Sequence, residues 1–511
     1  MENNRVDAKD GMWLSMLTIH EAVDSLQQYL GKPIDLEIKY MTFPHHQDDQ
    51  MVLIYIRSIV DPLNINMNIL DPIREAIAKE QITDEPLKDQ PLIQGILASC
   101  KPVLMDNKEM ADVLFEGNWL ILVNQLAQGF YYNAVNWHNR EMVPPEREVG
   151  LVGPRDAFTE DIDINLSLIR RRIRDNSIRI EEYVIGERSK TKVNVVYMDG
   201  LVNEKALGMF RDRIDDFKLD IVLDSTQIGY LISKQVYSPF PMFQLTERPD
   251  KAASSMLEGR FVVVVDTSPS VLIFPTTITC LYEASDDYYF SSIAALLFRG
   301  IRLLGLSITL FLPSLYVAIT TVNQDVFRVQ FMLAVTASRE GIPYPSYIEV
   351  IIMLLLIELI NEATVRLPRT IGGTATIVGG LIIGTAAAQA HLISYIMIVI
   401  TATTAIGSYT APNYMVGLAW RILSFLIVIM AIPLGLYGVV IGTGFIGLYL
   451  CHLHSFGVPY TAPFSTFRYK DLFRDAMTRV SRGMMRIRPS TYSREAAGKK
   501  RLEWLEQEDL F

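Results

Sequence analysis

The sequence predicts an α/β N-terminal region of two similar subdomains, followed by an all-α membrane domain of several spans and a basic C-terminal tail. Two observations support this: apolar residues gather in the second half, and a strand–turn–helix unit occurs twice in the first. The chain has 511 residues, 20% of them charged, with a mean hydropathy of +0.21. Soluble domains carry about 25% charged residues. We expect subdomains at residues 1–145 and 146–286, the membrane domain at 287–465 and the tail at 466–511.

Composition also narrows the class of protein and its compartment. Three cysteines in so long a chain favour a reducing environment and exclude a disulfide scaffold. The first ~30 residues show no basic stretch followed by an apolar one, so we expect no cleaved signal and a cytosolic N-terminal region. A formal net charge of −10 gives no case for nucleic acid binding, which requires a basic surface.

The two N-terminal units share a spacing as well as a pattern. In the first, residues 36–41 (LEIKYM) and 52–56 (VLIYI) read as strands and residues 67–78 as a helix. In the second, strands are predicted at 178–183 and 193–198 and a helix at 205–217. Matching residues recur 142 positions apart: Tyr55, Val60 and Asp61 correspond to Tyr197, Val202 and Asn203. Duplication and the chance likeness of two α/β units both fit this spacing.

The second subdomain contains a helix with acids at its start and arginines at its end. Thr159 is the predicted N-cap, and the order of charge follows the helix dipole. Plain helix stabilisation is one interpretation; docking of an acidic partner or neighbouring subunit is the second, and an anionic lipid surface the third. A loop at 237–260 adds Glu247 and Arg248, which could pair with Asp250 or Glu258. The residues considered for subunit assembly are Arg155, Glu160, Arg170, Arg171, Arg172, Glu247 and Arg248.

The second half holds several stretches long enough to cross a bilayer. Residues 303–322 form 20 uncharged residues, preceded by an interfacial segment at 287–300. Residues 326–338 are too short to span. Further candidates are 346–367, 371–390, 392–407, 419–437 with a kink at Pro433, and 439–453. Four to six spans are therefore expected.

Ionisable groups within a predicted span suggest a polar path or an internal pair. Glu358, Glu362 and Arg366 recur every fourth residue and therefore share one helix face. Glu362 can pair with Arg366, which leaves Glu358 deeper. Glu349 forms a capping box with Ser346 in the same helix. A water-filled path, an intersubunit contact and a structural buried network all remain open.

Small residues at every fourth position mark the next helix, from Gly372 to Ala388. Such a ridge allows close helix packing, whereas residues 377–383 could instead line an apolar constriction that gates by dewetting. The candidate ion-pathway residues are Glu358, Glu362, Arg366, Ile377, Gly380, Leu381 and Gly384.

Other motifs give no catalytic or cofactor prediction. The G-x-G-x-x-G at 442–447 lacks a βαβ context, so we interpret it as helix packing. Cys451, His452 and His454 fit interfacial polar residues better than a metal site, and His45 and His46 fit a solvated loop. We therefore expect no enzyme activity, no metal and no cofactor.

The tail is strongly basic. Residues 468–501 carry eleven Lys or Arg and three acids, a net charge of +8. Juxtamembrane basic residues favour the cytoplasmic side. Both termini are therefore expected in the cytoplasm, which requires an even number of crossings.

The motifs together resemble the A subunit of GerA-type spore germinant receptors across nearly the whole chain beyond residue ~30. In the first half the matching motifs are GPRDAFTE (153–160), LIRRRI (168–173), SPFP (238–241), TERPD (246–250) and LEGR (257–260). In the second half they are LPSLY (312–316), REGIP (339–343), VRLP (365–368) and IVGG (377–380). One motif, VDTSPS (265–270), is closer to the related stage V sporulation protein AF.

The resemblance implies a multi-pass protein of the inner membrane of bacterial spores. It implies an oligomeric, ion-conducting receptor subunit whose partners are a transporter-like B subunit, which takes the nutrient, and a C lipoprotein. Membrane lipid is a further expected partner. The alternatives are a channel component like stage V sporulation protein AF, which amplifies ion release, and a non-conducting scaffold.

Overall fold

The computed structural model divides the chain into two compact units, each described here by itself. The α/β unit contains the described residues up to Ile232 together with 245–275, and the helical unit contains 233–244 and the described residues from 276 onward. The structure describes residues 19–43, 46–60, 66–78, 91–124, 126, 128–133, 144–145, 148, 150–216, 219–234, 237–326, 328–366, 380 and 384–465.

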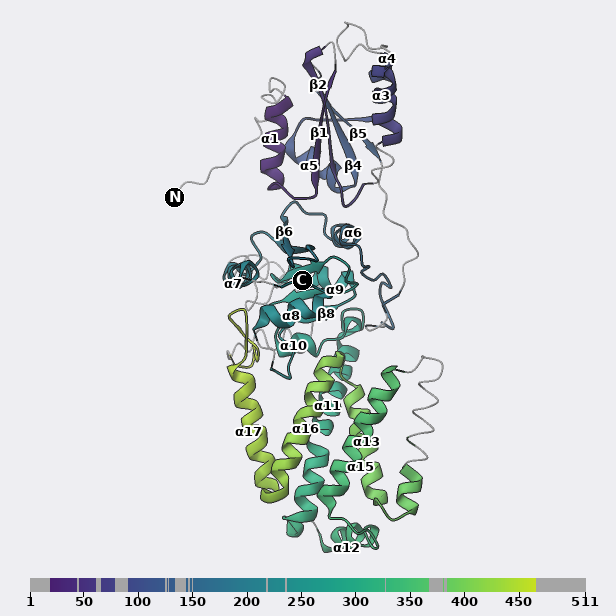
Figure 1. The fold of residues 1–511 in the computed structure, drawn as a ribbon, viewed down its shortest axis with the longest axis vertical. Helices are drawn as coiled ribbons and strands as arrows, with labels where there is room; N and C mark the ends of the chain where they lie inside the picture. The colour runs from purple at the N-terminus through teal and green to yellow at the C-terminus, as the bar shows by residue number, and fades with distance from the viewer. Residues whose placement is uncertain are drawn as a thin grey trace, which may run out of the picture. The chain divides into compact units, whose positions relative to one another are not determined.

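The first half of the α/β unit is a five-stranded sheet with helices on both faces (Figure 1). Its strands lie in the order β1 (Leu36–Phe43), β2 (His46–Ile56), β4 (Asn118–Val123), β5 (Gly129–Asn133) and β3 (Lys101–Val103), and each neighbouring pair is antiparallel. Residues 51–56 of β2 are all buried. Alternate side chains therefore enter two cores. One core holds α1 (Ile19–Leu30) and α5 (Asn107–Phe115), and the other holds α3 (Asp71–Ala78) and α4 (Pro91–Ala98).

The second half of the unit repeats this arrangement. The sheet order is β6 (Ile178–Ile185), β7 (Thr191–Met198), β9 (Phe261–Val265), β10 (Val271–Phe274) and β8 (Gln244–Thr246). On one face, α6 (Ile162–Arg172) and α9 (Pro249–Leu257) pack on Val262 and Val264. On the other, Phe210 of α7 (Glu204–Asp215) lies 5.1 Å from the ring of Phe261. The helix α8 (Ser225–Ser233) follows.

The two sheets have the same strand order and the same register. Leu36 pairs with Ile56 in the first sheet and Ile178 with Met198 in the second, so both pairs are related by the predicted offset of 142 residues. The helices α5 and α9 begin 142 residues apart as well. The structure therefore confirms the repeat that the sequence pattern predicts.

The helical unit centres on α11 (Ser292–Thr321), which contacts the other long helices of the unit. Its elements are α10 (Ile278–Leu281), η5 (Ser285–Tyr288), α11, η6 (Gln324–Val326), α12 (Val329–Ser338), α13 (Ser346–Arg366), α15 (Tyr395–Tyr409), α16 (Tyr414–Leu434), α17 (Leu436–His452), β11 (His454–Ser455) and β12 (Val458–Pro459). The helices α11 and α15 approach closely at two glycines. A Cβ added to Gly407 would lie 2.5 Å from the carbonyl oxygen of Gly305.

Within the described part of the chain, two helical stretches are long and apolar enough to cross a membrane: Ile293–Thr321 and Tyr414–Leu434. Two further apolar helices, α15 and α17, are shorter. The predicted 371–390 span lies mostly outside the described residues, so the structure leaves the expected four to six crossings open.

The helix α11 begins at Ser292, inside the segment 287–300, whose interfacial placement stays a prediction. One detail of the helical predictions was wrong. The predicted kink at Pro433 is instead the last turn of α16, and the chain reverses at Gly435, whose φ is +60°. The helix α17 then packs back against α16, where a Cβ on Gly438 would lie 2.1 Å from the carbonyl oxygen of Met430.

The segment 233–244 belongs to the helical unit although both its neighbours in sequence lie in the α/β unit. Phe240, fixed between two prolines, packs edge-on against Trp420 at 5.9 Å and against Tyr460 at 6.0 Å. The hydroxyl of Ser455 donates a hydrogen bond to the carbonyl of Met242. The SPFP motif thus contributes an aromatic anchor to the helical core.

Candidate functional site

The most unusual feature of the helical unit is a set of ionisable side chains among apolar helices. The helix α13 carries most of them, at Glu349, Glu358, Glu362 and Arg366. Charged groups in such surroundings need a partner or water. The structure provides a partner for each: Glu362 and Arg366 pair within α13, whereas Glu349 and Glu358 are bound by residues outside it.

Glu358 pairs with Arg421 of α16. Arg421 Nε lies 2.7 Å from Glu358 Oε1, and the arginine side chain is 9% exposed. The guanidinium also lies over the ring of Tyr414, at 5.6 Å. The sequence prediction placed Glu358 deeper than the Glu362–Arg366 pair but named no partner. Arg421 lies near the start of the predicted span 419–437, and its place opposite α13 is set by helix packing.

A few polar side chains lie beside this pair. A cavity of about 20 Å³ beside it is lined by Thr309, Thr404, Ser408 and Ser424. This volume is close to the minimum that one water molecule needs. The Ser424 hydroxyl and Arg421 Nη2 are buried without a hydrogen-bond partner within the described structure. Leu354, Ile357, Ala405 and Phe425 complete the lining, so the ion pair and its few polar neighbours lie in mainly apolar surroundings.

Glu362 and Arg366 form the i, i+4 pair that the sequence predicts. Arg366 Nε donates to Glu362 Oε1 at 2.8 Å. The Glu362 side chain is 59% exposed and the Arg366 side chain is 78% exposed. Next to them, the Tyr409 hydroxyl donates to Asn361. This end of α13 is thus a polar surface that the described part of the chain leaves uncovered.

Glu349 does not form the predicted capping box with Ser346. Its carboxylate is fully buried and accepts hydrogen bonds from the backbone N–H and the hydroxyl of Ser394, while Arg339 Nε lies 3.5 Å from Oε2. Ser394 caps α15 through the N–H of Met397. Glu349 therefore joins the start of α13 to the start of α15, a contact between residues 45 positions apart.

A third cluster lies before α11. Asp287 is buried and accepts from both terminal nitrogens of Arg302 at 2.7 Å and from Arg299 Nε at 3.1 Å. Burial favours the neutral acid, but the hydrogen bonds and charges of the two arginines hold the pKa of Asp287 below its usual value. The first turns of α11 are thereby fixed to η5.

The remaining ion-pathway candidates are only partly described. Ile377 and Leu381 lie outside the described residues. Gly380 and Gly384 are helical, and a Cβ added at either would meet no described atom within 4 Å. The close packing that their spacing favours is not observed within the described chain. Their place in an ion path stays a prediction.

The residues considered for subunit assembly fall into two groups. Arg170 and Arg248 are buried and paired inside the α/β unit, with Asp35 and Asp250 respectively. Arg248 thus uses the first of its two predicted partners, whereas Glu258 pairs with Arg260. The predicted N-cap Thr159 was wrong: Asp161 caps α6 by accepting from the N–H groups of Asp163 and Ile164.

The second group faces outward. Arg155, Glu160 and Arg171 are exposed, and Arg172 is half-buried and paired with Asp156. Three of these arginines line an open hollow of about 640 Å³ together with Pro154 and Asp156. Glu247 is partly exposed, and its carbonyl accepts from the N–H of Phe158. These side chains are the ones that the described α/β unit leaves open to a partner.

Across the described residues, no three His, Cys, Asp or Glu side chains gather in a metal-binding geometry. The ring of His454 contacts the carbonyl of His452. The basic tail, 466–511, and His45 lie outside the described residues.

Comparisons with known proteins identify relatives along most of the chain. "Uncharacterized membrane protein YfkQ" of Bacillus subtilis (strain 168) is 36% identical over 443 residues, 86% of this chain and 85% of the relative. "Spore germination protein KA" of the same organism is 33% identical over 471 residues, 91% and 85% of the two chains. "Spore germination protein A1" of the same organism is 35% identical over 371 residues, which cover 73% of this chain and 77% of the relative.

A solved structure, the crystal structure of the N-terminal domain of the A subunit of the Bacillus megaterium spore germinant receptor GerK3, is 26% identical with a TM-score of 0.39. The match covers 50% of this chain and 94% of the chain in the solved structure.

The family model described as "Bacillus/Clostridium GerA spore germination protein" matches residues 24–491. This match takes in both repeats of the α/β unit and every described element of the helical unit. The chain therefore belongs to the Bacillus/Clostridium GerA spore germination protein family.

Proposed function

We propose that the chain is a membrane subunit of a spore germinant receptor and forms an oligomeric ion channel. In this proposal a partner subunit binds the nutrient, the channel opens, and ion release commits the spore to germinate. Family membership supports a role in germination. The proposal assigns no chemical reaction and no cofactor to the chain.

The observation that carries the channel proposal is the uncovered polar end of α13. Glu362 and Arg366 are mostly exposed, whereas the same helix also exposes Leu359, at 66%. An ion pair on a helix in a bilayer is costly unless it faces water or protein. A second copy of the chain with a water-filled path between copies would meet this requirement.

The proposed topology has α11 and α16 crossing the inner spore membrane, with α13, α15, α17 and the predicted span 371–390 completing an even-numbered multi-pass bundle and both termini in the cytoplasm. The lengths and apolarity of the first two helices support it. The test is cysteine labelling in a background whose three native cysteines are serine. Gln324→Cys, after α11, should react from the side opposite to Ser189→Cys in the α/β unit; reaction from the same side would contradict the topology.

The channel test is ion flux through the full chain in liposomes, with and without co-reconstituted transporter-like and lipoprotein subunits. Glu362→Gln with Arg366→Gln should change conductance by about tenfold, because both charges would face the ion path. Glu340→Gln, an exposed acid outside α13, is the matched control. Unchanged flux from correctly assembled Glu362→Gln/Arg366→Gln protein would remove α13 from the pore.

A specific observation favours the rival scaffold function. Glu349 and Glu358 are both neutralised inside the chain, as in a bundle built for rigidity. A scaffold predicts sealed liposomes even when the partner subunits and a nutrient mixture are present. A channel component like stage V sporulation protein AF predicts flux that no nutrient changes. Nutrient-dependent flux supports the receptor proposal over both.

A further inference from the structure

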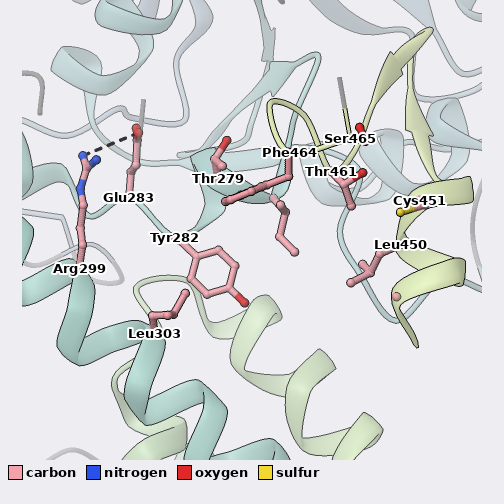
Figure 2. Close-up of a pocket in the computed structure, with 12 residues that line it drawn as sticks. Thr279, Tyr282, Glu283, Arg299, Leu303, Leu450, Cys451, Thr461, Phe464 and Ser465 are labelled. Carbon is pink, nitrogen blue, oxygen red and sulfur yellow. Dashed lines mark ion pairs between the residues drawn. The ribbon is translucent and has the colours of Figure 1, made fainter. Parts of the chain in front are cut away.

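The helical unit contains a cavity of about 520 Å³ that the channel proposal does not use. Its walls come from four segments: α10 and the residues after it, the first half of α11, the last turns of α17, and the loop at 461–465. Figure 2 shows Tyr282 and Leu303 on one side of this space and Leu450 and Cys451 on the other. Its volume lies within the range of small-molecule sites.

The cavity has two chemically different parts. Tyr282, Leu303, Leu450 and Phe464 supply an apolar wall. At the other part, Arg299 Nη2 lies 3.7 Å from Glu283 Oε1, the pair marked in Figure 2. An amphipathic molecule matches such a site better than water or a plain hydrocarbon, since each of those leaves one part poorly matched.

The surroundings indicate where an amphipathic ligand comes from. Leu303 on the wall is 65% exposed, and the adjacent Leu304 and Leu448 are 60% and 70% exposed. Gly447 on the wall has no described atom within 4 Å of an added Cβ, so the wall is thin at this point of α17. The cavity therefore adjoins the apolar outer faces of α11 and α17.

We propose that this cavity binds one acyl chain of a membrane glycerophospholipid. The chain lies against Tyr282, Leu303 and Leu450, and its polar end lies toward Arg299. The proposal rests on the membrane placement of the helical unit but not on ion conduction. Because Glu283 and Asp287 both pair with Arg299, the site selects a long apolar chain, with little preference for headgroup charge.

The first test uses the full chain in phosphatidylethanolamine vesicles that contain phosphatidylglycerol with a photoactivatable diazirine on one acyl chain. Illumination should label peptides around Leu303 and Leu450 more strongly than the exposed apolar stretches of α13 and α16. Equal labelling of all exposed helix faces would overturn the proposal. Resistance to carbonate extraction, measured on the same vesicles, checks membrane placement separately, so failure of the topology and failure of the site give different results.

A matched pair of variants tests the same site by filling it. Gly447→Trp places an indole in the cavity, whereas Gly444→Trp puts the same residue on an exposed position of α17 outside it. Labelling at Leu303 should fall by about fivefold in the first and stay unchanged in the second. Equal labelling of the two variants, both monodisperse on gel filtration, would overturn the proposal.

Discussion

Arg170 and Asp35 form a buried two-point ion pair between the two repeats of the α/β unit. Arg170 Nη2 lies 2.7 Å from Asp35 Oδ1 and Nε lies 2.8 Å from Oδ2, and both side chains are 3% exposed. The Ser58 hydroxyl donates to the same carboxylate, and the guanidinium lies 5.8 Å from the Phe115 ring. The arginine of α6 in the second repeat is thereby inserted among residues of the first.

Removing Arg170 should destabilise the chain strongly. Arg170→Ala leaves Asp35 buried without its counter-charge, and breaking a buried pair in this way costs about 3–5 kcal/mol. Arg171→Ala, at the exposed next position, is the control and should change stability little. Thermal unfolding of the full chain in detergent measures both. Equal melting temperatures would show that the pair contributes nothing to stability.

Replacing one partner of the Glu358–Arg421 pair should destabilise the protein, whereas replacing both with apolar residues should restore most of its stability. Arg421→Met alone leaves a half-buried carboxylate unpaired between helices and should lower the melting temperature. Glu358→Leu with Arg421→Met should recover most of the loss, because an apolar pair of similar volume avoids the cost of desolvating charges. A double variant as unstable as the single one would contradict this account. The measurement is again thermal unfolding in detergent.

The close contact between α11 and α15 should not tolerate a methyl group. Gly407→Ala sets a Cβ 2.5 Å from the carbonyl oxygen of Gly305 and 2.8 Å from Thr309 Oγ1, so the helices must move apart. We expect a loss of about 1–3 kcal/mol, as for other overpacked sites. Gly444→Ala, in an open position of α17, should be neutral or slightly stabilising. A stable Gly407→Ala protein would mean that the two helices have room to separate.

Glu181 should make the stability of the α/β unit depend on acid pH. Burial alone would raise the pKa of Glu181, but hydrogen bonds from Arg211, Tyr197 and Tyr183 lower it below the usual value. A carboxylate with a lowered folded-state pKa stabilises the fold above its unfolded pKa of about 4.3. That contribution disappears as pH falls from there through the folded pKa.

The matched variants for this prediction are Glu181→Gln and Glu182→Gln, at adjacent positions of β6 whose side chains point to opposite faces. Melting temperature against pH should fall less steeply on the acid side for the first variant than for wild type. The second should follow wild type. If the melting temperature of all three proteins falls equally as the pH becomes acidic, the proposed role of Glu181 is refuted.

Local pattern was sufficient to suggest the repeat, and the shared strand order and register then established it. A strand that is apolar at nearly every position is buried on both faces, so residues 52–56 and 193–198, with Asn194 as the exception, could be recognised before their partners were known. The i, i+4 pair of Glu362 and Arg366 was equally readable, because helix geometry places such residues side by side. Caps were less certain: Thr159 and Asp161 are both good capping residues, and the start of α6 decides between them.

The sequence by itself determined that this protein has an α/β half with two similar units followed by an apolar helical half, and its motifs indicated the family. Only the tertiary structure decided which charges meet: Asp35 with Arg170, Glu349 with Ser394, and Glu358 with Arg421. The reason is physical. Periodicity reports which face of an element is buried, but partners far apart in the chain are set by how helices and sheets pack, and that depends on all their side chains at once.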